Sequence, residues 1–457
     1  MKKSKYLIEG RAVFMKKILA GMLAGAMVLG ALTGCSGGKQ ETQGPAAEGT
    51  ATTAAAEAGD GKKADRGETK TLDVVWFSDG KEGESFMKLA GEYMELHPEI
   101  KIELIEVPYA DLDNKLKNMI NAGQQPALAR ITNLGVVQNQ LIDLNQYVSD
   151  PEAFKNNFGS GLRTDFDGKF LAAPMDVTAN GIIYNKTAFE KAGVAVPQSE
   201  DEIWTWEEYE EALKKVMEGS DCKYGMVFDF SQQRFATLIY QAGGSLLKDD
   251  MTASNINSPE TKKALEWFKK LHDDGIMPAS VWLGAENPNE MFRTGQVATH
   301  FAGSWMIANY KDQITDFEWG VTYLPKDATR ATVPGGKWLA AFDGTGVEKE
   351  AAEFVEWISQ PEQNARYYVE NYYLSQVKGN ESLDYDFGAE YFEIFSNELN
   401  ATNDVPGKEY GYQAFINSIQ ADMKNGISEV LAGNLSVDEL IESIDALATE
   451  SLEELSQ

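Results

Sequence analysis

The chain has 457 residues, of which 71 are acidic and 41 are basic, so its formal net charge is −30 at pH 7. Such a charge argues against nucleic-acid binding, which needs a positive footprint, and against attraction to anionic lipid. Two cysteines and three scattered histidines argue against a disulfide framework and a cysteine-rich metal site, so we expect no metal and no cofactor.

The N-terminal segment carries the pattern of an exported protein. Lys16 and Lys17 precede a short apolar run that ends in Leu-Thr-Gly-Cys at residues 32–35. A positive start, a short apolar stretch and small residues are typical of a secretory signal peptide. The Leu-Thr-Gly-Cys string resembles the lipobox of bacterial lipoproteins, in which the cysteine is lipidated and becomes the mature N-terminus. An uncleaved anchor or a simple secretion signal are the alternatives, and Met15 is an alternative start to Met1.

Lipidation at Cys35 implies that residues 1–34 are a signal peptide and that the chain is held at the outer face of the cell membrane. The signal contains six basic residues and one acid, so 70 acids face 35 bases in the remainder. Residues 35–70 contain no large apolar side chain and are predicted to be a disordered tether. The exported chain of roughly 420 residues is long enough for two large lobes.

Folded structure is predicted to begin at Thr71. The expected elements are a strand at 71–77, a helix at 85–96, a strand at 100–107, a helix at 111–122 and a strand at 128–132. Later elements are strands at 181–186, 224–228 and 320–324 and helices at 206–217, 261–272, 348–359 and 436–447. Thr205 and Glu208 predict a capping box for the helix at 206–217. The alternation of strands and helices predicts an α/β protein with parallel sheets covered by helices.

Several strings, in order, resemble the extracellular solute-binding proteins of ABC transporters, in particular the carbohydrate-binding, maltose-binding-protein-like family. They are Gly-Ile-Ile-Tyr-Asn-Lys-Thr-Ala-Phe-Glu-Lys-Ala-Gly at 181–193 with Trp-Thr-Trp-Glu-Glu at 204–208, the segment 291–305 ending in Gly-Ser-Trp, the segment 319–336 ending in Pro-Gly-Gly, and the C-terminal segment 427–447. One departure is Pro126-Ala127, where the family commonly carries Pro-Asp.

The resemblance implies a two-lobed, Venus-flytrap fold that the chain crosses three times, with the ligand between the lobes. Matching the family's order puts the crossings near 176–180, in 335–342 and near 403–408. The expected first lobe is then 71–177 plus 342–403, and the second is 178–341 plus 404–457. Pro or Gly lies close to each crossing, which suits flexing backbone, although ordinary turn chemistry explains these residues equally well.

Sugar chemistry indicates which side chains to seek at strand ends and crossings. Hydroxyls pair with carboxylate, amide or guanidinium groups, and the C–H faces of a sugar stack on aromatic rings. In open α/β sheets such clefts lie beyond the carboxyl ends of strands. The candidate ligand-binding residues are Trp76, Asp79, Asn133, Asp176, Thr178, Gln232, Arg234, Trp282, Trp305, Gly336 and Trp338. Trp76 fits a core position equally well, Asp79 a turn and Asn133 a cap. Trp305, which follows Gly303-Ser304, is the strongest candidate.

The function predicted from these observations is a non-enzymatic receptor that captures an extracellular carbohydrate and delivers it to the transmembrane subunits of an ABC importer. The same receptor role for a peptide, a polyamine or another solute is the main alternative. A secreted glycoside hydrolase is a further one, because an acid-rich chain can supply the two carboxylates that such an enzyme needs. Nothing in the sequence resembles a nucleophile elbow, a zinc HExxH motif or a P-loop. We expect a monomer.

Overall fold

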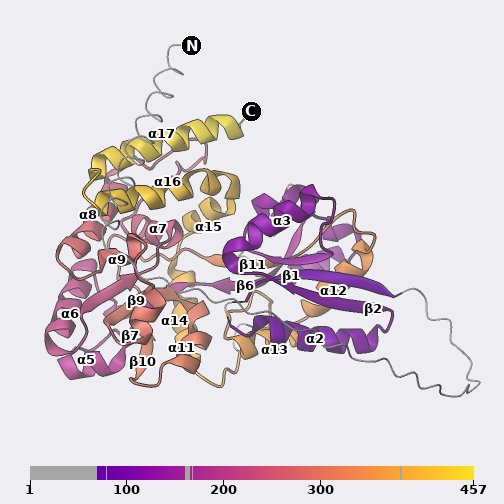
Figure 1. Ribbon diagram of the computed structural model, residues 1–457, viewed down its shortest axis with the longest axis horizontal. Coiled ribbons are helices and arrows are strands. Elements are labelled where there is room, and N and C mark those ends of the chain that lie inside the picture. The colour runs from indigo at the N-terminus through magenta and orange to yellow at the C-terminus, as the bar shows by residue number, and fades with distance from the viewer. Residues whose placement is uncertain (1–68, 79, 160–164, 167, 381–382, 457) are drawn as a thin grey trace, which may run out of the picture. The chain divides into compact units, whose positions relative to one another are not determined.

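Figure 1 shows a computed structural model, which describes residues 69–78, 80–159, 165–166, 168–380 and 383–456. The predicted signal peptide, Cys35 and the tether up to residue 68 lie outside the described residues, as does Asp79. Among the described helices none has the length and apolar character of a membrane span.

The first of two main sheets has five strands in the order β2-β1-β3-β11-β6. Its strands are β1 (Lys70–Trp76), β2 (Ile100–Glu106), β3 (Leu128–Ile131), β6 (Ala172–Thr178) and β11 (Gly335–Ala341). β1 pairs in parallel with β2 and β3, whereas β11 runs antiparallel to both β3 and β6. The prediction of a parallel sheet holds for β1, β2 and β3 and is wrong for β11, which pairs antiparallel with β3 and β6.

Helices cover both faces of this first sheet, as the alternation of side chains along β1 requires. Val74 and Trp76 pack in the core under α2 (Glu82–Leu96), α12 (Glu348–Ile358) and α13 (Pro361–Asn371). Val75 packs in the other core, which includes Leu116 of α3 (Leu112–Asn121). Figure 1 shows α3 and α2 on opposite sides of the sheet.

The second sheet has the order β10-β7-β9-β8. Its strands are β7 (Asn180–Asn185), β8 (Tyr224–Phe228), β9 (Val297–Gly303) and β10 (Trp319–Thr322). β9 pairs in parallel with β8 and antiparallel with β7, so this sheet is also mixed. The helices packed in this half include α5 (Lys186–Ala192), α6 (Trp206–Gly219), α7 (Gln232–Gln241), α8 (Pro259–Asp273), α10 (Pro288–Arg293), α16 (Gln413–Leu431) and α17 (Val437–Leu455). The predicted capping box of α6 is confirmed, since both of its hydrogen bonds are present.

The strand pairing also shows where the chain passes between the sheets. Only Ala179 separates β6 from β7, so the first crossing lies inside the predicted segment 176–180. β11 belongs to the first sheet, which moves residues 335–341 out of the predicted second lobe. The next passage precedes α14 (Ala389–Ala401), which packs on β7 and β10, whereas α13 packs on α2. We propose that this passage lies between the bridge of Val377 to Phe158 and the start of α14, rather than at 403–408, which would place α14 in the second lobe.

Glu398 of α14 is a buried carboxyl group in this half of the protein. Its Oε1 accepts a hydrogen bond from the Leu324 amide at 3.0 Å, and its Oε2 lies 3.5 Å from Nη2 of Arg330. Burial raises the pKa of Glu398 from 4.5 to about 7, although Arg330 opposes the rise.

We expect the free energy of unfolding to carry a Glu398 contribution that is fully present below about pH 4.5 and is lost as the pH rises to about 7. Between these pH values the Glu398 carboxyl group keeps its proton in the folded state, whereas the unfolded chain has already released it. This contribution to the free energy of unfolding is at most about 3 kcal/mol. Urea unfolding of the wild type and Glu398→Gln at several pH values measures this contribution. If the two proteins show parallel pH dependence, the raised pKa is contradicted.

Candidate ligand-binding site

A cavity of about 540 Å³ lies where the two sheets approach each other, a volume in the range of small-molecule sites. Residues after β1 and β3 of the first sheet line one side, and residues of α7 and the turn after β9 line the other. The crossing segments and the start of α16 complete the lining. The lining residues that carry chemistry are Phe77, Tyr109, Asp113, Thr132, Asn133, Thr178, Gln232, Gln233, Arg234, Trp305, Lys337, Trp338, Tyr410, Gln413, Asn417 and Gln420.

Trp305 dominates the second-lobe side of the cavity. It lies in a 3-10 turn (Ser304–Met306) that directly follows the buried strand β9. The turn is held to the first crossing, because the Ser304 amide donates to the carbonyl of Ala179 at 3.1 Å. A Cβ at Gly303 would come within 2.0 Å of Trp305 Cζ3 and 2.4 Å of the Ala179 carbonyl oxygen, so only glycine fits there. The close packing at Gly303 and the hydrogen bond of Ser304 to Ala179 thus determine the position of the Trp305 indole.

Amides and aromatic rings dominate the first-lobe side. The rings of Phe77 and Tyr109 lie 5.1 Å apart between centroids, and Tyr109 is 58% exposed. The Asn133 amide exchanges hydrogen bonds with Asn417 of α16 at 3.1 and 3.3 Å. Asp113 also accepts from Asn133 at 3.4 Å, and burial raises the pKa of Asp113 despite this hydrogen bond. The wall therefore offers mainly neutral hydrogen-bonding groups beside aromatic surface.

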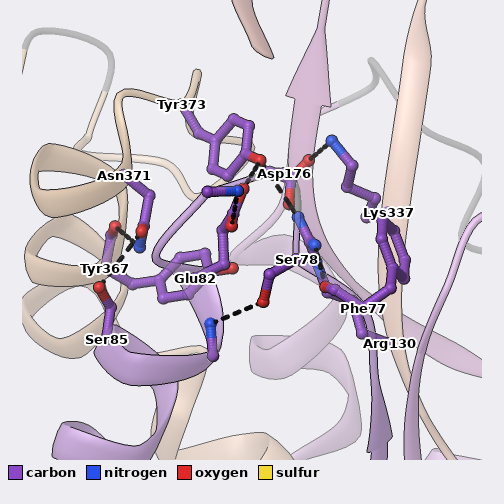
Figure 2. Close-up of polar contacts among 12 residues, drawn as sticks. Phe77, Ser78, Glu82, Ser85, Arg130, Asp176, Lys337, Tyr367, Asn371 and Tyr373 are labelled. Atoms are coloured by element: carbon purple, nitrogen blue, oxygen red, sulfur yellow. Dashed lines mark hydrogen bonds and ion pairs between the residues drawn. The ribbon is translucent and has the colours of Figure 1, made fainter. Parts of the chain in front are cut away.

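Asp176 does not line the cavity and lies at the centre of a buried charge cluster, which Figure 2 shows. Its Oδ2 lies 3.2 Å from Nη2 of Arg130, and its Oδ1 lies 3.1 Å from Nζ of Lys337. Arg130 also donates to the carbonyl of Phe77 at 2.7 Å, and the Tyr373 hydroxyl bonds to Glu82. The cluster links β3, β6 and β11. Inside the first lobe, the carboxylate of Asp176 balances the charges of Arg130 and Lys337.

The structure brings most of the predicted site residues together. Asn133, Thr178, Gln232, Arg234, Trp305, Gly336 and Trp338 all line the cavity. Trp76 and Trp282 do not: Trp76 packs 4.3 Å from the ring of Phe86, and Trp282 is 1% exposed with its Nε1 donating to the Phe228 carbonyl at 3.2 Å. Both indoles belong to cores, and Asp176 belongs to the charge cluster. Asp79 lies outside the described residues.

Several lining residues were not among the predicted ones. Phe77 and Tyr109 each follow a strand of the first sheet, so the rule that sites gather at the carboxyl ends of strands was a signal for both. Asp113, Gln413 and Asn417 lie on helices, in amphipathic segments whose polar faces look like ordinary solvent-exposed surface. No pattern in the sequence separates these three from other exposed polar residues.

A second, larger cavity of about 1390 Å³ lies against the same crossing strands. Val177 lines it, whereas the neighbouring Thr178 lines the first cavity, and successive side chains of a strand point to opposite faces. Its other walls come from the segment 374–380, α14 and α15 (Asp404–Gly411). The carboxyl ends of the parallel strands meet the smaller cavity, which is therefore the better candidate site.

Comparison with known proteins agrees with this architecture. Residues 88–379 match the family model described as bacterial extracellular solute-binding protein. A putative binding protein of Brucella abortus is 24% identical over 335 residues, which cover 70% of this chain and 79% of the relative. The diacetylchitobiose binding protein DasA of Streptomyces coelicolor is 24% identical over 314 residues, covering 65% and 71% of the two chains.

Two solved structures share the fold. An ABC substrate-binding protein of Listeria monocytogenes in complex with cycloalternan superposes with a TM-score of 0.73 at 21% identity, covering 85% of this chain and 99% of that one. The GacH receptor of Streptomyces glaucescens gives a TM-score of 0.72 at 19% identity, covering 85% and 100%. The predicted two-lobed α/β fold is confirmed. The matched residues span most of the described structure, and the chain belongs to the family of bacterial extracellular solute-binding proteins.

Proposed function

We propose that this solute-binding protein captures an uncharged carbohydrate in the cavity lined by Trp305 and delivers it to an ABC importer. The observation that carries the proposal is the composition of the cavity wall. Aromatic rings from both lobes stand beside amides and hydroxyls, which is the combination that sugar faces and sugar hydroxyls require.

The charges around the cavity favour a neutral ligand. Asp113 is the only carboxylate among the described lining residues, in a chain with 71 acids. The two lining cations, Arg234 and Lys337, each face a carboxylate of the protein, Asp229 and Asp176 respectively. A polyamine would find too few anions in such a wall. A glycoside hydrolase needs two carboxylates on either side of the scissile bond, which this set of lining residues does not supply.

The names of related proteins support the same class of ligand. Relatives include the diacetylchitobiose binding protein of Streptomyces coelicolor and a lactose-binding protein of Rhizobium radiobacter. Structural neighbours were solved with cycloalternan and with maltotriose. Another relative is the sn-glycerol-3-phosphate-binding protein of Pectobacterium atrosepticum, so a phosphorylated polyol is the second candidate. Arg234 and Lys337 would have to give up their carboxylate partners to bind it.

A panel of ligands tests the proposal directly. We expect one of maltotriose, cycloalternan, lactose or diacetylchitobiose to raise the stability of the protein by about 2.7 kcal/mol at 100 times its dissociation constant. Thermal unfolding detects the hit, and calorimetry measures its affinity. Stabilisation by glycerol 3-phosphate or spermidine alone, or by no member of the panel, would contradict capture of a neutral sugar. Hydrolysis of the bound sugar would contradict a purely binding role.

Anchoring through a lipid on Cys35 belongs to the same proposal. A sugar receptor that serves a membrane importer gains from attachment, and the Leu-Thr-Gly-Cys string at 32–35 supports it. We expect Cys35→Ser to move the protein from the membrane fraction to the soluble fraction, since the acidic chain has little attraction for anionic lipid. Cys222→Ser, at the other cysteine, serves as the control. A Cys35→Ser protein that still sediments with membranes would rule the anchor out.

A further inference from the structure

A series of polar contacts runs from the buried interior of the second lobe, through the partly exposed Asp229 and Arg234, to Trp305. The Tyr310 hydroxyl of α11 (Ile307–Gln313) lies 2.7 Å from Nδ1 of His300, on β9. Nε2 of His300 lies 3.0 Å from Oδ1 of Asp229. The other oxygen of Asp229 lies 3.2 Å from Nε of Arg234. The guanidinium of Arg234 in turn lies over the Trp305 ring, 4.2 Å from its centroid.

The guanidinium is held on several sides. Nε faces Asp229, while Nη1 donates to the Ser231 hydroxyl and to Oε1 of Gln233, both at 3.4 Å. Nη2 donates no hydrogen bond to a described residue of the protein, and Arg234 lines the cavity. Nε lies at ion-pair distance from Asp229 without hydrogen-bond geometry, so this ion pair, the two hydrogen bonds of Nη1 and the planarity of the group together set the orientation of the guanidinium. Nη2 is thus the nitrogen left to donate to a ligand.

Asp229 is suited to hold that orientation. Burial would raise the pKa of Asp229, but His300 and Arg234 outweigh burial and keep the pKa below its usual value. The carboxylate is therefore an anion with both oxygens engaged. His300 and Tyr310 are fully buried, so the inner end of the series is fixed in the packed core of the second lobe. Because His300 and Tyr310 are held in place, they can fix Asp229, which in turn can position Arg234.

We infer that Asp229 is a positioning residue of the binding site: together with His300 and Tyr310 it holds the Arg234 guanidinium against Trp305, so that Nη2 donates to a hydroxyl of the sugar stacked beside it. The inference rests on the proposed function for the identity of the ligand. It adds a specificity element, because a sugar that places a hydroxyl at Nη2 is preferred over one that leaves this charged donor without an acceptor.

A double-mutant cycle separates positioning from a general structural role. Binding of maltotriose, or of the panel sugar that binds, is measured by calorimetry on the full chain for Asp229→Asn, Arg234→Gln and the double variant. We expect each single variant to weaken binding about tenfold, as loss of a charge-assisted hydrogen bond would. The double variant is expected to bind no more weakly than Arg234→Gln alone. Losses that multiply in the double variant would overturn the inference, as would an unchanged affinity for Asp229→Asn. Asp221→Asn, at an exposed ion pair, is the control.

A second measurement needs no ligand. In protein with nitrogen-15-labelled arginine, the Hε resonance of Arg234 should be shifted upfield by the Trp305 ring, and its signal is assigned by its loss in Arg234→Gln. We expect Asp229→Asn to move this signal toward the position of a free arginine. A signal that stays in place in Asp229→Asn would show that Asp229 does not position the guanidinium. If no sugar of the panel binds, the proposed function fails, while this spectrum still decides the positioning.

Discussion

Asp176→Ala is expected to lower the free energy of unfolding by about 3–5 kcal/mol, because it removes the carboxylate that faces two buried cations. Arg130 and Asp176 are fully buried, and the side chain of Lys337 is 9% exposed. Without Asp176, both cations lose the anion they share in a region from which water is excluded. Urea denaturation followed by circular dichroism measures the loss, since the midpoint falls while the slope is retained.

The matched control is an ion pair of the same chemistry on the surface. Lys191 and Asp221 lie 2.7 Å apart, but the Asp221 side chain is 95% exposed. Water and salt screen such a pair, so Asp221→Ala is expected to leave the denaturation midpoint unchanged. If Asp176→Ala behaved like Asp221→Ala, the charge cluster of the first lobe would have to be accessible to water, contrary to the structure.

Trp305→Ala is expected to weaken sugar binding by at least about 2 kcal/mol, roughly thirtyfold, while the protein stays folded. The indole lines the cavity, and its loss removes both a stacking surface and the ring over which the Arg234 guanidinium lies. Calorimetry with the sugar identified in the panel gives the affinity. The unfolding midpoint without ligand shows whether the fold is kept.

A tryptophan outside the cavity provides the comparison. Trp357 of α12 is also partly buried, packs 5.2 Å from Tyr93 between ring centroids, and lines neither cavity. Trp357→Ala should lower stability and leave affinity unchanged, the reverse of the pattern expected for Trp305→Ala. Equal affinities for the wild type and Trp305→Ala would remove Trp305 from the binding site.

Local features of the fold could be predicted from the sequence, whereas strand partners could not. The capping box at Thr205 and the parallel strands β1, β2 and β3 follow from short-range patterns. The crossings depend on which distant segments pair. β11 joins the first sheet through hydrogen bonds to β3 and β6, residues more than 150 positions away, and no local pattern specifies that partner.

In the candidate site, the sequence predicts which residue types are suitable but not which way each side chain faces. Trp76 and Phe77 are neighbours at the end of β1, and both were suitable by residue type. Successive side chains of a strand face opposite sides, and a pattern alone does not say which face looks toward the cavity. The structure places Phe77 in the core on one face of the sheet, where it also lines the cavity, and Trp76 in the core on the other face, away from the cavity. Asp176 likewise has the right chemistry for a ligand contact, but Arg130 and Lys337, which face it, come from other strands.

The need for glycine at position 303 limits which substitutions can change the ligand that this protein prefers. Even a methyl group there would collide with the indole and with the carbonyl oxygen of Ala179, at the junction where β6 becomes β7. The indole of Trp305 is therefore packed directly against the segment that joins β6 to β7. We therefore expect variants selected for a different ligand to carry substitutions around the indole of Trp305 rather than at Gly303.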